Sequence, residues 1–222
     1  MTRHKTAPHA ASDSTREALL AAGAEVFAVH GFQHARMRDI AERAGANLSA
    51  INYHFGSKEG LYDAVFERLT SEAIERYPLL PPELAGEPAE VRFAVLVRNL
   101  LHRLIAPESP TPISRIMARE LTNPTEAIER WAGKVIQPQL ALVVALVAEL
   151  LGPAASPERM RNIALSTIGQ STFYLFARPM LTRLFPELYQ SNSAIDAVAA
   201  HITRFSLDAI AATRAAATRT EA

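Results

Sequence analysis

The feature that most limits the fold of this chain is the spacing of its apolar residues, which recur every three or four positions over most of its length. Long runs that alternate apolar and polar residues, as strands do, are missing, and only 9 of the 222 residues are glycine. A spacing of three and four places apolar side chains on one face of a helix. The sequence therefore predicts an all-α fold.

Residues that start and stop helices divide the chain into segments. Ser14 and Glu17 form a capping box, which predicts a helix that starts there and ends at Gly31. Pro138 is expected to kink or split the helix that contains it. The further helices are expected at about 37–44, 48–55, 57–77, 89–106, 112–122, 124–151, 157–178 and 193–215, with a short helical turn at 179–186.

Proline also marks the expected domain boundary. The segment from Pro78 to Pro88 contains Pro81 and Pro82, and proline disfavours the helical state before it. We therefore expect a flexible arm at 1–11, a first domain at 12–72, a connecting helix end and linker at 73–88, a second domain at 89–215 and a flexible tail at 216–222.

Composition narrows the classes of protein. The chain has no cysteine, which excludes disulfides and thiolate metal sites, and its 23 Lys and Arg balance 23 Asp and Glu. The first 14 residues have no apolar core of signal-peptide length. The longest apolar run, 140–151, contains Glu149 and is too short to span a bilayer. The sequence predicts a cytoplasmic protein with no membrane partner.

The most informative segment is 38–55, which reads as a helix, a tight turn at Gly45 and a second helix. Ile40 and Ala41 are expected to face inward from the first helix and Ile51 from the second, while Asn47 is placed to cap the second. This pattern predicts a helix-turn-helix, whose second helix lies in the major groove of DNA. A helical corner without DNA contacts has the same pattern.

The outward side of the second helix carries side chains suited to DNA. Small and amide-bearing groups read base edges or touch thymine methyl groups, and Tyr53 and His54 can bond to phosphates. Lys58 lies in the first turn of the next helix, where backbone donors and a cation share one phosphate. Residues 1–60 carry seven Lys and Arg against six Asp and Glu, so the local positive charge is weak.

Residues 12–72 resemble the DNA-binding domain of TetR-type transcriptional regulators. The resemblance is carried by the motifs at 24–32, 38–45 and 53–61, the last of which reads Tyr-His-Phe-Gly-Ser-Lys-Glu-Gly-Leu. It implies that Tyr53, His54 and Lys58 meet the DNA backbone. The family often has Ser or Thr where this chain has Ala35-Arg36, so either Arg36 contacts a phosphate or the cap is lost. The residues expected at DNA are Arg36, Arg38, Asn47, Leu48, Ser49, Ala50, Asn52, Tyr53, His54 and Lys58.

The last two long helices are apolar around more than one face, as in helices that are buried both in their own domain and against a partner. The resemblance implies that two such helices from each subunit form a four-helix interface in a homodimer. A two-fold dimer also suits a palindromic operator in double-stranded DNA. The residues expected at this interface are Ile168, Phe176, Val198, Ile202 and Phe205.

The second domain is similar to the CecR subgroup of the same family. The similarity rests on 47–53, on Arg119-Glu120-Leu121 with Pro124, on Ile136-Gln137-Pro138, and on 168–174. It implies a domain that responds to a small-molecule effector, which we expect to be apolar or amphipathic.

Polar and aromatic residues set among apolar ones are the candidates to bind the effector, since small-molecule sites have mostly apolar walls with a few polar groups. Gln170 and Ser166 have an alternative role as bonds across the dimer, and the arginines have one as surface pairs with Glu120 or Glu126. The candidates are His102, Arg115, Arg119, Trp131, Gln139, Gln170, Phe173 and Tyr174.

Motifs that would support an enzyme are missing. The sequence has no glycine-rich phosphate loop after a strand, no G-x-S-x-G and no H-E-x-x-H. We expect no catalytic residue, no metal and no cofactor. The favoured function is a sequence-specific DNA-binding regulator, a repressor that its ligand releases. The alternatives are a helical dimeric scaffold without a specific DNA role and a small-molecule enzyme.

Overall fold

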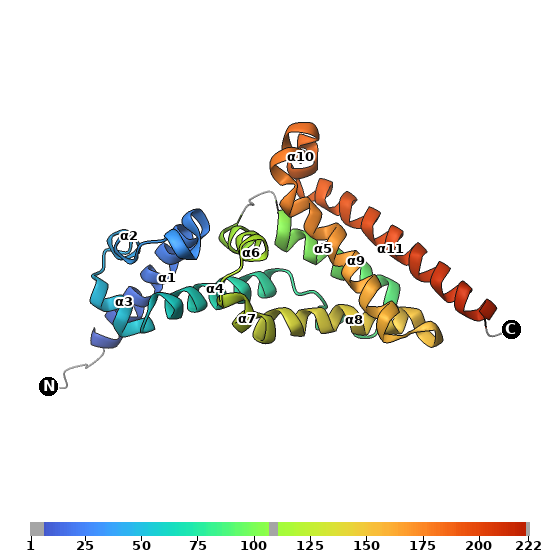
Figure 1. The fold of residues 1–222 in the computed structure, drawn as a ribbon, viewed down its shortest axis with the longest axis horizontal. Helices are drawn as coiled ribbons and strands as arrows, with labels where there is room; N and C mark the ends of the chain where they lie inside the picture. The colour runs from blue at the N-terminus through green and yellow to red at the C-terminus, as the bar shows by residue number, and fades with distance from the viewer. Residues whose placement is uncertain (1–6, 107–110, 221–222) are drawn as a thin grey trace. The chain divides into compact units, whose positions relative to one another are not determined.

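The computed structural model describes residues 7–106 and 111–220, and these contain helices and no strand. The predicted all-α fold is confirmed. The helices form two compact units, each of which Figure 1 shows as a ribbon. One unit joins the chain up to Glu72 with residues 111–128, and the other joins residues 73–110 with the chain from Glu129 onward. Residues 111–128, which we expected in the second domain, thus group with the first.

The first unit is a cluster of helices around one apolar core. The side chains of Leu19, Phe27, Ile40, Ile51 and Leu61 are all fully buried in it. α1 contacts α2, α3 and most extensively α6. The elements are α1 (Ala7–His34), α2 (Met37–Arg43), α3 (Leu48–Phe55), the larger part of α4 (Lys58–Arg76) and α6 (Pro112–Thr122).

The start of the chain differs from the prediction. α1 begins at Ala7, so Ser14 lies inside the helix and the predicted capping box is wrong. Residues 7–11 are helical and not an arm, while residues 1–6 lie outside the described part. Gly31 does not end the helix but kinks it with a φ of 70°, and α1 continues to His34. A positive φ is a conformation that glycine adopts without steric cost.

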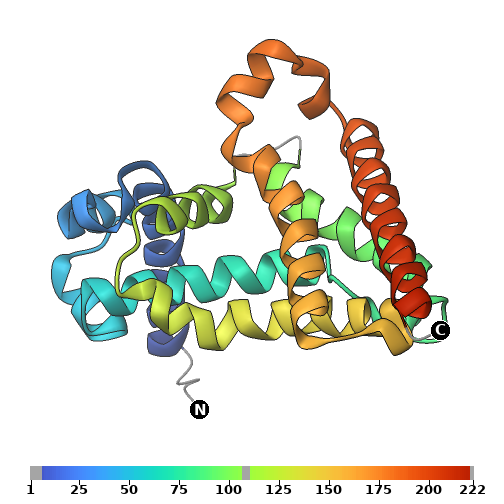
Figure 2. The same cartoon turned by 45° about the vertical axis from the view of Figure 1, so that its right-hand side comes forward.

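The second unit is built on α5 (Ala89–Ile105), which packs against α8 (Gln137–Leu151), α9 (Pro157–Phe176) and α11 (Asn192–Thr220). Figure 2 shows α5, α9 and α11 crossing one another. Short elements connect them: η1 (Pro82–Leu84), α7 (Ala127–Trp131), η2 (Ala132–Ile136), η3 (Gly152–Ala154), α10 (Arg178–Leu184) and η4 (Pro186–Tyr189).

The expected helix starts and turns are largely present. Ser57, Thr111 and Ser156 each accept a hydrogen bond from a backbone N–H three residues later, as predicted for caps. α10 provides the short helical turn expected at 179–186. α11 continues to Thr220, so residues 216–220 are helical and not a tail, and residues 221–222 lie outside the described part.

Pro138 breaks the long helix as predicted. Proline has no N–H and clashes with the carbonyl four residues earlier, and the preceding turn widens to a π-helix over Ala132–Ile136. The helical stretch as a whole runs from Ala127 to Ala154 and is long and apolar enough to cross a membrane, by length and composition alone. Our argument that the apolar run is too short for this is therefore wrong. The stretch packs against α5 and α9, and Val143 and Val147 are among its buried side chains.

Gly60 gives a test of the close approach between α3 and α4. A Cβ atom at Gly60 would lie 2.1 Å from the backbone oxygen of Phe55, the last residue of α3, so that the backbone must move. We expect Gly60→Ala to lower the free energy of unfolding by about 2–3 kcal/mol, as overpacking does, in a urea titration. Gly133→Ala is the control, because a Cβ atom there meets nothing within 4 Å. Equal stability of the two variants would contradict this account.

Candidate functional site

α3 is held in place by its cap and by one buried side chain. The Asn47 Oδ1 accepts a hydrogen bond of 2.9 Å from the Ala50 backbone N–H, so the predicted cap is confirmed. The Ser49 hydroxyl donates to the same oxygen at 2.6 Å. Ile51 is fully buried against the core of the first unit. These contacts fix which face of α3 remains open.

The open face of α3 carries most of the residues expected at DNA. Leu48, Ser49, Asn52 and Tyr53 are exposed, and 81% of the Tyr53 surface is accessible. The Tyr53 ring lies 4.9 Å from the half-buried His54 ring. An exposed phenol on a rigid helix is an unusual use of a large side chain, and it suits contact with a partner.

Basic side chains flank this face. Arg36 is the N-cap residue of α2 and makes no side-chain cap bond, so the usual cap is lost and its exposed guanidinium is left for other contacts. Arg38 is also exposed. The Lys58 ammonium donates to the Gln33 carbonyl at 3.3 Å and lies 4.8 Å from the centre of the Phe32 ring. Partial burial lowers the pKa of Lys58 from its ordinary value, and the neighbouring Glu59 opposes this shift.

α6 is tied to the first unit by two polar contacts that the sequence did not reveal. The Arg119 guanidinium donates to the Val29 carbonyl at 2.6 Å, beside the kink in α1. The buried Glu120 carboxylate accepts a bond of 2.9 Å from the Tyr62 hydroxyl and bonds from the N–H and hydroxyl of Thr125. The suggested surface pairing of the arginines with Glu120 is therefore wrong.

The pKa of Tyr62 reflects the depth of the Tyr62–Glu120 contact. Burial raises the pKa of the Tyr62 phenol above its ordinary value, and the Glu120 carboxylate raises it further. The phenol thus stays protonated and serves as a permanent donor. Arg115 and Arg119, two of the candidates to bind an effector, belong to this α6 segment, and Arg119 is already engaged with α1.

Another candidate, His102, is buried in the second unit. Its Nε2 lies 2.8 Å from the Asp196 carboxylate, and its ring stacks on Tyr77 at 5.1 Å. The Arg103 guanidinium donates to the Tyr77 carbonyl at 2.6 Å, which ties the residue after α4 to α5. Burial acts to raise the pKa of Asp196, but hydrogen bonds from His102 and Arg98 outweigh it and hold the pKa below its ordinary value.

The other candidate effector residues are spread over the second unit. Gln139 accepts a bond from Arg103 at 2.8 Å, and Trp131 is buried. Gln170 donates to the Ser166 carbonyl one turn earlier in the same helix. Phe173 is 52% exposed and meets the Tyr174 ring edge-on. The structure does not bring these residues together around one cavity.

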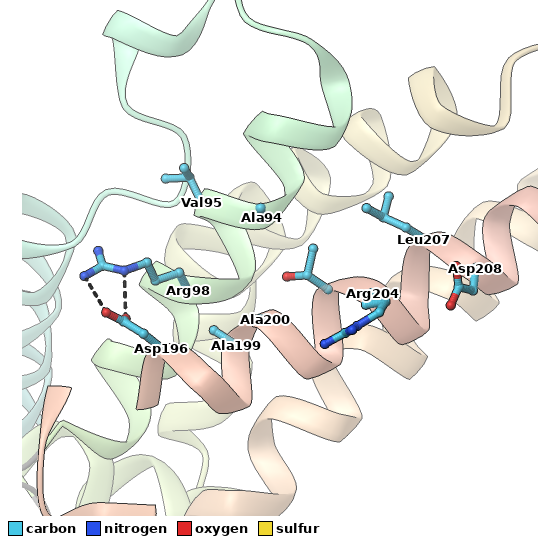
Figure 3. Close-up of a pocket in the computed structure, with 10 residues that line it drawn as sticks. Ala94, Val95, Arg98, Asp196, Ala199, Ala200, Arg204, Leu207 and Asp208 are labelled. Atoms are coloured by element: carbon cyan, nitrogen blue, oxygen red, sulfur yellow. Dashed lines mark hydrogen bonds and ion pairs between the residues drawn. The ribbon is translucent and has the colours of Figure 1, made fainter. Parts of the chain in front are cut away.

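A groove of about 450 Å³ lies instead between α5 and α11 (Figure 3). None of the eight candidates lines it. Its lining combines small apolar side chains with charged ones from two helices that are nearly 100 residues apart in sequence, a combination that no local pattern reveals. The lining residues are Ala94, Val95, Arg98, Asp196, Ala199, Ala200, Thr203, Arg204, Leu207 and Asp208.

Clusters that could bind a metal are not found within residues 7–106 and 111–220, where no group of three His, Asp or Glu side chains is arranged to hold an ion.

Two family models together cover most of the chain. Residues 19–65 match the model of bacterial regulatory proteins of the tetR family. Residues 89–210 match the C-terminal domain of the HTH-type transcriptional dual regulator CecR. The chain belongs to the TetR family. Its second unit carries the CecR-type C-terminal domain, and the protein is a DNA-binding transcriptional regulator.

Curated relatives agree with this assignment. The chain is 30% identical to the dual regulator CecR of Shigella flexneri over 168 residues, which cover 71% of this chain and 74% of CecR. It is 38% identical to the transcriptional repressor NicS of Pseudomonas putida over 79 residues, or 33% of this chain and 37% of NicS.

Solved structures share the fold at low identity. The regulator FadR from Bacillus subtilis, in complex with stearoyl-CoA, has a TM-score of 0.66 and 14% identity, covering 86% of this chain and 97% of FadR. A regulator from Pseudomonas aeruginosa has a TM-score of 0.63 and 19% identity, covering 94% of this chain and 96% of its own.

Glu120 gives a test of the place of α6 in the first unit. Glu120→Ala removes the acceptor of the Tyr62 hydroxyl and the Thr125 N–H, and buried donors left unpaired cost about 1–3 kcal/mol each. We expect a loss of about 2–4 kcal/mol in the free energy of unfolding in urea. Glu126→Ala, at an exposed position six residues later, should change it by less than about 0.5 kcal/mol. If the two variants are equally stable, the buried contact does not stabilise the fold.

Proposed function

We propose that this regulator is a cytoplasmic homodimer that represses transcription from a palindromic operator and is released by a small effector. The observation that carries the proposal is the exposed face of α3, where Ser49, Asn52 and Tyr53 project from a helix anchored by Ile51. A repressor needs only to occupy its site, because a bound dimer blocks the promoter sterically.

The DNA-facing residues divide into two roles in this proposal. Asn52 reads a base edge, for which an amide is suited, and Leu48 and Ala50 touch apolar base surfaces. Tyr53, His54 and Lys58 position the protein on phosphates. The exposed guanidinium groups of Arg36 and Arg38 and the polar residues Asn47 and Ser49 complete the surface.

Dimerisation is typical of the TetR family, and exposed apolar side chains support it here. Of the five residues expected at the interface, Val198 and Ile202 are buried within the single chain and Ile168 is half-buried. Phe176 and Phe205 are exposed, at 41% and 59%. We therefore propose an interface of exposed residues on α9 and α11: Leu165, Phe173, Phe176 and Phe205.

Release follows from a difference in affinity. An effector shifts the equilibrium only to the extent that it binds one state of the protein more tightly. We propose that the favoured state holds the two α3 helices at a spacing that does not fit two half-sites. The ligand of the FadR structure, stearoyl-CoA, is amphipathic, and we infer that an apolar or amphipathic molecule acts on this chain too.

A catalytic role and a DNA-independent scaffold are the competing functions. The relatives are transcriptional regulators, and we propose that the chain has no catalytic activity. A scaffold would not need Tyr53, His54 and Lys58 beside an exposed helix face. Specific binding of a duplex separates a regulator from a scaffold.

The test of the function is selection of bound duplexes from random DNA by the purified protein, read by sequencing. We expect enrichment of a palindrome with two half-sites about one helical turn apart, or a multiple of it. Deletion of the gene should raise transcripts next to the matching sites. Lowered transcripts would reverse the sign of regulation, and no enriched sequence would contradict the DNA-binding role.

Two variants in the same selection distinguish the proposed roles. Tyr53→Ala should weaken binding to all sequences similarly and reduce the slope of log K against log salt if it removes a phosphate contact. Asn52→Ala should relax the preference at one base pair, worth about 1–3 kcal/mol. An unchanged sequence preference in Asn52→Ala would remove this residue from base recognition.

The dimer interface is tested by a charge in its centre. Phe205→Asp places a carboxylate against an apolar partner face, and we expect the mass from light scattering to fall from dimer to monomer, with at least tenfold weaker operator binding. Val91→Asp is the control, because Val91 is a comparably exposed apolar residue on α5. A dimeric Phe205→Asp variant would place the interface elsewhere.

A further inference from the structure

The groove between α5 and α11 has an apolar floor made of small side chains. Ala94 and Val95 come from α5, and Ala199, Ala200 and Leu207 come from α11. Because three of these five residues are alanine, the helices leave space that larger side chains would fill. The volume of about 450 Å³ lies within the range of small-molecule sites.

Charged side chains line the edge of this floor. Figure 3 shows Arg98 and Asp196 at one end, Asp208 at the other and Arg204 between them. The Asp196 carboxylate is occupied by Arg98 at 2.8 Å and by His102 at 2.8 Å. Arg98 uses its Nε and one terminal nitrogen for this pair.

The free hydrogen-bonding groups of the edge are mainly donors. An arginine carries five N–H donors in a planar fork, so Arg98 keeps spare donors and Arg204 has all of its own, with no ion pair recorded in the described part of the chain. Asp208 supplies the single carboxylate that is not engaged. An anionic group therefore finds two cations, whereas a cation finds one carboxylate between arginines.

One buried polar group also lines the groove. Thr203 is 8% exposed, and its hydroxyl has no hydrogen-bond partner among the described residues. Threonine in a helix occupies two χ1 rotamers, and the other rotamer offers this hydroxyl to a ligand. An unpaired buried hydroxyl is costly, which favours a polar partner in the groove.

The groove is connected to the end of α4 by direct contacts. Asp196 lines the groove and binds His102, whose ring stacks on Tyr77, the residue after α4. α4 is a continuous helix that begins at Lys58, three residues after α3 ends. A ligand that draws Arg98 away from Asp196 thus acts on a contact that reaches Tyr77.

We propose that the groove between α5 and α11 is an effector site for an amphipathic monocarboxylate, with the apolar body on the alanine floor and the carboxylate at Arg204 and Arg98. The proposal rests on the ligand-released function proposed above and names the site and ligand class for it. It places the effector away from Trp131, Gln139 and Gln170.

The first test is calorimetric titration of the full chain with octanoate and 4-phenylbutyrate, each matched by its neutral alcohol. We expect saturable binding of at least one acid, at least tenfold tighter than its alcohol, because charge-assisted hydrogen bonds are the stronger ones. If neither acid binds, or if acid and alcohol bind equally, the proposal is wrong.

Matched variants place the binding in the groove. Arg204→Gln should weaken binding of the acid about tenfold, and Ala200→Trp, which fills the groove from an exposed position, should abolish it. Arg219→Gln and Ala215→Trp are controls on exposed positions of the same helix outside the lining. Unchanged binding in Ala200→Trp would place the ligand elsewhere and overturn the assignment.

The second readout is release of the selected operator by the acid. We expect release from the wild type, and none from Tyr77→Leu although that variant still binds acid and operator. Binding of the acid without release overturns the effector role of the groove alone. Absence of any enriched operator instead overturns the proposed function, while the calorimetric result still decides whether the groove is a carboxylate site.

Discussion

An eight-residue helix has almost no stability of its own in water, because the cost of its first turn is not recovered over so short a length. α3 therefore depends on the burial of Ile51 and on the cap at Asn47. The close approach of Gly60 to the Phe55 carbonyl then sets where α4 begins. The exposed face of Ser49, Asn52 and Tyr53 is a consequence of this anchoring, and recognition of DNA depends on it.

Short-range signals predicted the first unit well. The turn at Gly45, the caps at Asn47 and Ser57 and the buried positions Ile40 and Ile51 all follow from residues within a few positions of one another. Such signals are local, and one sequence is enough to detect them. The capping box at Ser14 shows their limit, because a motif that can start a helix does not do so when the preceding residues are also helical.

Long-range contacts could not be predicted in the same way. Glu120 and Tyr62 are 58 positions apart, and Arg119 and Val29 are 90 apart. A charged pair of neighbours on a helix looks like a surface feature until the partner helix is known. The groove is harder still, since alanine contributes to it by leaving space, and Val198 and Ile202 were expected at a partner although their own chain buries them. Tertiary packing decides such residues.

The grouping of α6 with the first unit has a consequence for dissecting the protein. The segment 111–128 supplies the acceptor for Tyr62 and the donor for the Val29 carbonyl, yet it follows α5 in the chain. A fragment cut after residue 72 would thus expose a polar seam that the intact chain covers, and a fragment that starts at residue 73 would carry an orphaned helix with a buried glutamate. The polypeptide passes between its two units more than once, so neither unit corresponds to a contiguous stretch of the gene.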